Sequence, residues 1–160
     1  MPNAAKFEHL DESPEAALGR IASATHCASL LQIWRESRVG TESIPTRSDL
    51  DPIVLAKAGL LPFVWILEQD DAGDLFYRLM GEGIRKYFAA QTRGRYLHEV
   101  YEGEMLDLVR ARCRRALDER LVMFASGTVY RDSSPLYYAR RLLMPLSDDD
   151  GGARFLIGTV

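Results

Sequence analysis

Residue types that could do chemistry are scattered along this chain. Asp49 and Asp51 lie two residues apart, a spacing at which paired carboxylates could bind a metal ion or share a proton. The same run, Ser-Asp-Leu-Asp-Pro, is typical of side chains that cap a turn and a following short helix, here over Ile53–Ala58, and we favour this interpretation. Cys27 and Cys113 are too few and too distant to indicate a disulfide framework.

The histidines and glycines do not indicate a site either. His9, His26 and His98 stand at scattered positions, which gives no metal-binding signature. The run Gly-Glu-Gly at 81–83 lacks the third glycine and the strand–helix context that dinucleotide binding requires. No Ser, His and Asp occur at a spacing typical of nucleophilic catalysis. We therefore predict no catalytic residues, no metal and no bound cofactor.

The length and composition indicate one folded domain with an extension. The chain has 160 residues, 47% of them hydrophobic, which is enough for one core. Its net charge of −3 comes from interspersed acids and bases. Even the arginines of 110–115 are flanked by acidic residues, so we expect no nucleic-acid or anionic-membrane surface. The chain start lacks the pattern of a secretion signal, and no apolar run reaches the ~20 residues of a membrane span. We expect a cytoplasmic protein.

The chain is organised around an apolar hairpin. Leu60–Leu67 is apolar at both alternate positions, and its length and its Val, Trp and Ile content favour a buried strand over a helix. Gln69–Asp74 has the composition of a turn, and Leu75–Met80 alternates as a strand does. A strand that is apolar on both faces belongs in the centre of a sheet. We predict that Leu61–Glu68 lies between the 75–80 strand and the final strand, Arg154–Val160.

A helix is expected before the hairpin. Residues 1–12 are polar and are expected to fray, Ser13 with Pro14 is typical of a helix start, and Gly40 is typical of a helix stop. Between these ends an apolar stripe recurs at spacings of three and four. The stripe is densest at Leu30, Leu31, Ile33 and Trp34. Two alternatives remain open: the stripe packs on the domain's own sheet, or it forms the contact of a homodimer.

The remaining elements complete an α+β chain. Residues 82–91 have the pattern of one or two short helical turns, and Gly103–Glu119 has that of a long helix with one apolar face. Three strands are expected after it, over Leu121–Arg131, Pro135–Pro145 and Arg154–Val160.

This order of two strands, a helical segment and three antiparallel strands resembles the PAS fold. Four stretches carry the resemblance by their order and spacing: Ile44–Pro52 with the upstream Trp34, Leu60–Glu68, Phe76–Ile84 and Thr92–Tyr101. Over about residues 30–160 the chain looks like the single-domain PAS proteins of alphaproteobacteria. The resemblance implies a PAS-like five-stranded antiparallel sheet with helices on one face over residues 41–160, after an N-terminal helical extension over residues 1–40. It also implies a role in sensing or protein contact, and it carries over no catalytic residues.

Two cofactor-binding branches of the PAS family are not matched. A photoactive flavin domain would need a reactive cysteine on the helical segment after the second strand, and residues 83–95 contain none. Haem-binding relatives use a histidine on the long helix, and Glu102–Arg120 contains none. His98 is expected at the surface or at a helix cap, and Cys113 is expected to act as a small hydrophobic residue. We expect no covalent cofactor and no haem or flavin colour.

A small-molecule pocket between the sheet and the long helix is one interpretation of the apolar residues that meet there. Its lining would consist of Leu79, Tyr87, Phe88, Leu106, Val109 and Cys113, with the inward members of Met123–Tyr130 and Tyr138–Met144. Arg78 and Tyr138 would supply the polar contacts that orient a ligand. The alternative is that these residues fill a closed core, and both interpretations remain open.

We therefore expect a sensory or regulatory domain that binds a small molecule or a partner protein and signals by protein–protein contact. The contact surface is expected on the N-terminal helix or on the sheet face away from the long helix, unless the N-terminal helix seals that face. The alternative is a small α+β-barrel enzyme of ketosteroid-isomerase-like shape, acting on a small apolar substrate. Such an enzyme needs a carboxylate in its pocket, for which Asp107 and Glu104 are the candidates.

Overall fold

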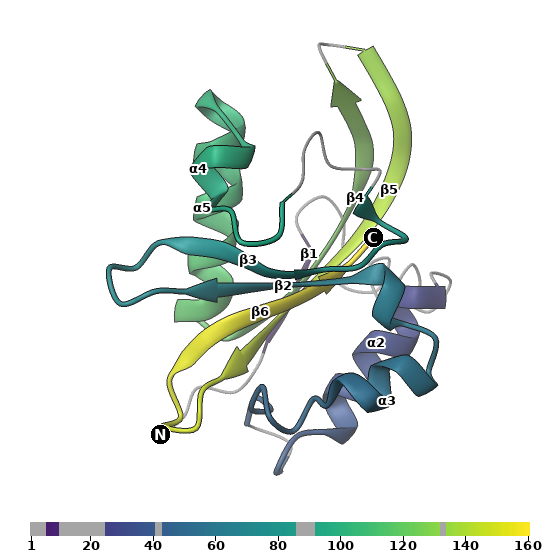
Figure 1. Cartoon of the computed structure of the whole chain (residues 1–160), viewed down its shortest axis with the longest axis vertical. Helices are drawn as coiled ribbons and strands as arrows, with labels where there is room; N and C mark the ends of the chain where they lie inside the picture. The colour runs from purple at the N-terminus through teal and green to yellow at the C-terminus, as the bar shows by residue number, and fades with distance from the viewer. Residues whose placement is uncertain (1–5, 10–24, 41–42, 86–91, 132–133) are drawn as a thin grey trace.

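The computed structural model describes residues 6–9, 25–40, 43–85, 92–131 and 134–160. Within these ranges, only the backbone is described for residues 6–9, 25, 126–131 and 134–139. Figure 1 shows a single twisted sheet with helices packed against it. The strands are β1 (Lys6–His9), β2 (Val64–Gln69), β3 (Leu75–Met80), β4 (Leu121–Arg131), β5 (Ser134–Ser147) and β6 (Ala153–Thr159). The helices are α2 (Thr25–Glu36), α3 (Pro52–Lys57), the 3-10 turn η1 (Leu61–Phe63), α4 (Leu97–Val100) and α5 (Gly103–Asp118).

The sheet has the strand order β1-β4-β5-β6-β2-β3. Neighbouring strands from β4 to β3 pair antiparallel, which confirms the predicted five-stranded antiparallel sheet. β2 lies between β6 and β3, as predicted from its apolar character on both faces. β1 adds a sixth strand, parallel to β4 at the edge, in a segment that the sequence predicted to fray.

The hairpin begins later than predicted. Residues 61–63 form a 3-10 turn closed by a hydrogen bond from the Phe63 amide to the Leu60 carbonyl, 2.8 Å long. Pro62 explains the difference, because its ring fixes φ and it has no N–H to donate to a neighbouring strand. The strand starts at Val64, whose carbonyl accepts a hydrogen bond of 2.8 Å from the amide of Gly81, the residue that follows β3.

A β-bulge in β3 changes which side chains face each way. Ile66 pairs with Leu79, but its neighbour Leu67 pairs with Tyr77, so Arg78 is an extra residue without an opposite partner. A bulge shifts the alternation by one position. As a result Tyr77 and Leu79 face opposite sides of the sheet.

Helices cover both faces of the sheet (Figure 1). α4 and α5, which follow the hairpin, pack on one face together with Leu67 of β2. α2 and α3 pack on the other face together with Ile66. Over the described residues α2 and α3 thus cover the second face, as in the alternative in which the N-terminal helix seals it, and a contact with a partner protein stays a prediction.

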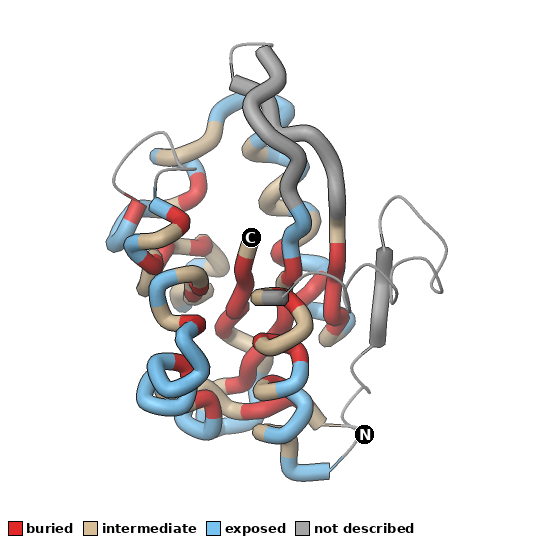
Figure 2. The backbone as a smooth tube through the Cα atoms, turned by 90° about the vertical axis from the view of Figure 1, so that its right-hand side faces the viewer, coloured by how far each residue is buried: buried red, intermediate tan, exposed pale blue. Residues whose placement is uncertain are grey.

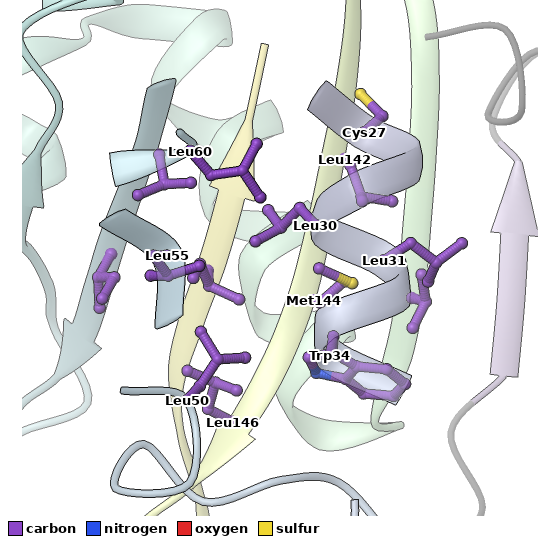
Figure 3. Packing of buried hydrophobic residues seen from close by; sticks show 14 of the residues in the cluster. Cys27, Leu30, Leu31, Trp34, Leu50, Leu55, Leu60, Leu142, Met144 and Leu146 are labelled. Atoms are coloured by element: carbon purple, nitrogen blue, oxygen red, sulfur yellow. The ribbon is translucent and has the colours of Figure 1, made fainter. Parts of the chain in front are cut away.

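Packing of α2 decides between the two alternatives left open for its stripe. Leu30 and Trp34 are 0% and 1% exposed, Leu31 is buried and Ile33 is half-buried. The indole Nε1 of Trp34 donates a hydrogen bond of 2.9 Å to the Pro145 carbonyl of β5. Figure 3 shows Leu30, Leu31 and Trp34 among leucines of the connector and of β5. The stripe packs on its own sheet, so these residues form no exposed contact for a second copy, and a homodimer stays a prediction.

The acidic run before α3 caps the backbone, as we favoured. The Asp51 carboxylate accepts a hydrogen bond of 2.7 Å from the Ile53 amide at the start of α3. Asp49 accepts a bond of 3.1 Å from the Thr46 amide, and the Thr46 hydroxyl in turn accepts one from the Asp49 amide. The Asp49 carboxylate thus stabilises the turn, and the Asp51 carboxylate caps the start of α3.

Candidate ligand site between the sheet and α5

A buried apolar cluster fills the interface between α5 and the sheet. Its buried members are Leu67, Leu75, Tyr77, Leu97, Cys113, Ala116, Leu117, Leu121, Met123 and Leu156. Half-buried residues packed against it are Trp65, Met80, Val100, Tyr101, Leu106, Val109, Leu143 and Ala153. These apolar members come from the strands, from α5 and from α4 with the residue that follows it.

One row of register partners runs across the sheet beneath α5. From β3 to β4 the successive partners are Met80, Trp65, Gly158, Leu143 and Met123. At Gly158 the row has no side chain, and the indole of Trp65 occupies that space. Trp65 also meets the Tyr77 ring edge to face, with centroids 6.4 Å apart. The floor under α5 is therefore apolar, with the indole of Trp65 at its centre.

The two faces of the sheet differ in how completely they are closed. In Figure 2 buried residues gather on the central strands. On the α2 face the cluster leaves few half-buried apolar side chains, whereas on the α5 face Trp65, Met80, Leu106, Val109 and Leu143 are all half-buried. Within the described part of the chain, apolar surface thus remains partly open on the α5 face.

Two tyrosines place polar groups in this apolar interface. The hydroxyl groups of Tyr77, which is 3% exposed, and Tyr101 lie 3.2 Å apart and share a hydrogen bond. Burial raises the pKa of Tyr77 well above its usual value, and Tyr101 raises it further, while the positive charge of Arg141 opposes the shift. Both hydroxyls can orient a ligand by hydrogen bonding.

The thiol at this interface is not reactive. Burial raises the pKa of Cys113 to about 12, and Arg112 only partly opposes this. On the other face, burial raises the pKa of Cys27 to about 11. Because the thiolate is the nucleophile, both cysteines act as small hydrophobic residues, as predicted for Cys113.

The structure brings together some of the residues predicted to line a pocket. Leu106, Val109 and Cys113 lie on the face of α5 that meets the sheet. Leu79 packs on the opposite face, because the bulge reverses the alternation that its prediction assumed. Arg78 is exposed and forms an ion pair with Glu68, with Nη1 and Oε2 2.6 Å apart. These two residues therefore do not line the interface.

Other predicted residues cannot be placed at the site. Tyr87 and Phe88 lie outside the described residues, and Tyr138 lies in β5 with a side chain that is also outside them. The sequence analysis missed the pairing of Tyr77 with Tyr101. The alternation of Tyr77 with Leu75 was a signal for its inward position, but no local pattern indicated that Tyr101 meets it.

Comparison with known proteins assigns the family. Residues 23–160 match the family described as PAS domain. The chain belongs to the PAS domain family. Among solved structures it is similar to the light-state structure of the blue-light photoreceptor Aureochrome1 LOV, with 14% identity and a TM-score of 0.43 over 67% of this chain and 85% of that one. A fungal LOV domain photoreceptor is similar at 15% identity and a TM-score of 0.41, over 87% of this chain and 94% of that one. No curated protein matches the chain.

The carboxylates required by the alternative enzyme reading do not face the interior of this PAS domain. Glu104 and Asp107 are exposed on α5, away from the sheet. Two histidines stack on neighbouring aromatic rings: His98 lies against Tyr96, and His26 lies against Phe63. No three His, Cys, Asp or Glu side chains gather as metal ligands would within the described ranges. Nor is any helix of that part of the chain both long and apolar enough to cross a membrane.

Proposed function

We propose that this PAS domain is a sensory domain that binds a small, largely apolar molecule between α5 and the sheet. The observation that carries the proposal is the hydrogen-bonded pair of Tyr77 and Tyr101, together with the half-buried apolar side chains that pack against the buried cluster under α5. Binding sites for small molecules combine apolar walls with a few polar groups. The α5 face has this combination, whereas among the described residues the α2 face has fewer half-buried apolar side chains.

The chemistry of the lining indicates the class of ligand. Apolar walls favour a chain- or ring-shaped hydrocarbon part, and burying ~200 Å² of it would contribute about 5 kcal/mol before the costs of association. The two tyrosine hydroxyls suit an oxygen acceptor. Arg141, on the exposed part of β5, acts on the Tyr77 hydroxyl through its positive charge. This favours a carboxylate over a neutral oxygen at that end of the ligand.

Strand β5 offers a route from the ligand to the rest of the molecule. Leu143 faces the ligand site, while its neighbours Leu142 and Met144 are buried against α2. The next residue, Pro145, accepts the hydrogen bond from Trp34. A ligand that displaces Leu143 would therefore change the packing of α2. Any such shift requires that the ligand bind one arrangement of α2 more tightly than the other.

Signal output by protein contact follows from the same route. When α2 packs less tightly, the apolar face that it covers, including Phe124 and Leu142, becomes available to a partner. A tenfold preference of the ligand for that arrangement supplies ~1.4 kcal/mol. Hydrogen exchange of the α2 amides with and without ligand measures this effect directly.

The binding proposal can be tested by tryptophan fluorescence. The chain has two tryptophans, so Trp34→Phe leaves Trp65, at the site, as the reporter. Octanoate and phenylacetate are titrated beside their neutral analogues octanol and phenylethanol. A saturable change in emission is expected, stronger with the acids, and Arg141→Gln should reduce that preference.

Site-filling variants complete the test. Leu106→Phe and Val109→Phe add volume at half-buried positions of α5 and should weaken binding at least about tenfold. Val54→Phe is the matched control, because Val54 is 44% exposed on α3, away from the site. The proposal fails if no compound changes the emission, or if the filled variants respond as Val54→Phe does.

A further inference from the structure

The hairpin of β4 and β5 extends beyond the rest of the sheet (Figure 1). β1 pairs with β4 only over Leu121–Phe124, and β6 pairs with β5 only over Leu142–Ser147. The pairing of β4 with β5 nevertheless continues to the end of β4 and the start of β5. Residues 125–131 and 134–141 therefore form a two-stranded ribbon, the β4–β5 ribbon, which has no third strand within the described part of the chain.

The β5 edge of this ribbon can accept a further strand. In an antiparallel pair, alternate residues direct their N–H and C=O groups away from the partner strand, so part of the backbone of 136–141 points away from β4. The next residue, Leu142, uses this side of β5 to pair with Thr159 of β6. The Arg140 carbonyl accepts a long hydrogen bond, 3.9 Å, from the Cys27 thiol, which leaves its second lone pair for another donor. A two-stranded hairpin alone is marginally stable in water, so an added strand in line with β6 would stabilise the ribbon.

The ribbon is positively charged, although the chain as a whole has a net charge of −3. Its strands contain Arg131, Arg140 and Arg141 and no acidic residue. Asp132, between the strands, is the one acid from 125 to 141. Arg140 and Arg141 are exposed, and neither forms an ion pair with another described residue. The charge of this edge therefore suits an acidic partner.

The two exposed arginines lie on opposite faces of β5. Side chains two residues apart in a strand share a face. Arg140 lies two residues before Leu142, which packs with the residues of α2, and Arg141 lies two residues before Leu143, which packs with those of α5. A strand paired with β5 would therefore meet both charges if it carried acidic side chains at two successive positions.

We propose that the β5 edge of the β4–β5 ribbon binds an extended acidic segment of a partner protein as an added β-strand. A peptide backbone supplies both the N–H and the C=O groups that a strand edge requires, whereas the phosphates of a nucleic acid only accept hydrogen bonds. The sequence of 136–139, Leu-Tyr-Tyr-Ala, favours apolar residues in the rest of the segment. This inference does not rest on the proposed ligand site. Because Arg141 also acts on Tyr77, the test uses Arg140.

Synthetic peptides test the proposal. The probe is a fluorescein-labelled peptide of about ten residues, in which Thr and Val alternate around two central Glu residues. A second peptide has Lys in place of Glu, and a third has Pro in place of each Val, which removes N–H groups that would pair with β5. The Glu peptide is expected to bind saturably in fluorescence anisotropy, at least about tenfold more tightly than either of the others. Amide hydrogen exchange over 136–141 should slow when it is bound.

Charge variants and a nucleic-acid probe complete the test. Arg140→Glu should weaken binding of the Glu peptide at least about tenfold and strengthen binding of the Lys peptide. Lys57→Glu makes the same change in net charge at an exposed position of α3 and should bind as the wild type does. Circular dichroism checks that each variant is folded, and Arg140→Gln, which removes the charge without reversing it, should show a smaller loss.

Several results would overturn the proposal. They are a Glu peptide that does not bind, a Lys peptide that binds equally well, and an Arg140→Glu variant that binds as Lys57→Glu does. Slower amide exchange that lies only outside 136–141 would also contradict it. An oligothymidylate that binds more tightly than the Glu peptide would indicate a nucleic-acid surface in place of a strand-binding edge.

Discussion

The indole of Trp65 lies directly over the backbone of Gly158, its register partner in the neighbouring strand β6. A methyl group at position 158 would overlap the six-membered part of the ring. The missing side chain at Gly158 is therefore what lets a tryptophan lie flat beneath α5. The shape of the floor of the ligand site depends on this pair.

Replacing Gly158 by alanine should destabilise the domain. The new methyl group forces Trp65 out of its place, and overpacking of this kind costs typically 1–3 kcal/mol. Denaturant unfolding measures the loss. Gly152→Ala is the matched control in the same hairpin, because the nearest atoms to its methyl group lie 3.6 Å away on Asp148. Adding Trp65→Leu to Gly158→Ala should recover part of the lost stability. Equal free energies of unfolding for Gly158→Ala and Gly152→Ala would contradict this explanation.

The buried thiol of Cys113 should make the fold sensitive to alkali. An unfolded thiol ionises near pH 9, whereas burial raises the pKa of Cys113 in the folded chain to about 12. The stability due to this shift is present below pH 9 and is lost as the pH rises towards 12. The loss should approach 1.4 kcal/mol per pH unit.

Cys113→Ala isolates this contribution from that of other groups. The free energy of unfolding of the wild type should fall more steeply than that of Cys113→Ala between pH 9 and pH 11. Parallel curves for the two proteins would show that the thiol is not buried as described.

The packing of α2 predicts that a substitution at Leu30 lowers stability strongly and that one at Gln32 hardly changes it. Leu30 is 0% exposed, so Leu30→Ala should cost about 3 kcal/mol of unfolding free energy. Gln32 is exposed on the same helix, and its side chain donates a hydrogen bond to the exposed Glu36. Gln32→Ala should change stability by less than about 0.5 kcal/mol. If α2 were loosely attached, the two variants would differ little in chemical denaturation.

Local sequence patterns predicted the elements better than their contacts. The turn chemistry of 69–74, the Asp51 cap and the apolar period of α5 each act over a few residues, so the sequence alone located the hairpin, α3 and α5. The bulge at Arg78 was not predictable from alternation, and it moved Leu79 to the other face of the sheet.

Contacts between distant segments account for the other differences. The hydrogen bond from Trp34 to Pro145 joins residues 111 positions apart, so the sequence could not decide whether the stripe of α2 meets its own sheet or a second copy. The meeting of Tyr77 with Tyr101 depends in the same way on how α4 and its following residue pack against β3. The site is therefore defined by tertiary contacts, although Leu106, Val109 and Cys113 were expected at this interface.

Methionine side chains lie at the ligand site, under α2 and on the outer face of α5. Met80 and Met123 belong to the row beneath α5, Met144 is buried under α2, and Met105 is exposed on the outer face of α5. The chain has five methionines, so their ¹³C-methyl NMR signals can be assigned by single substitutions. The spectra report ligand binding, its effect on α2 and the outer face of α5 in one sample.

Titration of the ¹³C-methyl-labelled protein with octanoate and phenylacetate, at a protein concentration where it is monomeric, tests the ligand site most directly. We predict that the tighter binder shifts Met80 and Met123 saturably with one dissociation constant, that Met144 follows through β5, and that Met105 does not move. Val109→Phe should abolish these shifts. The absence of any shift at Met80 and Met123 with both compounds, or equal unsaturable shifts that include Met105, would contradict a ligand site between α5 and the sheet.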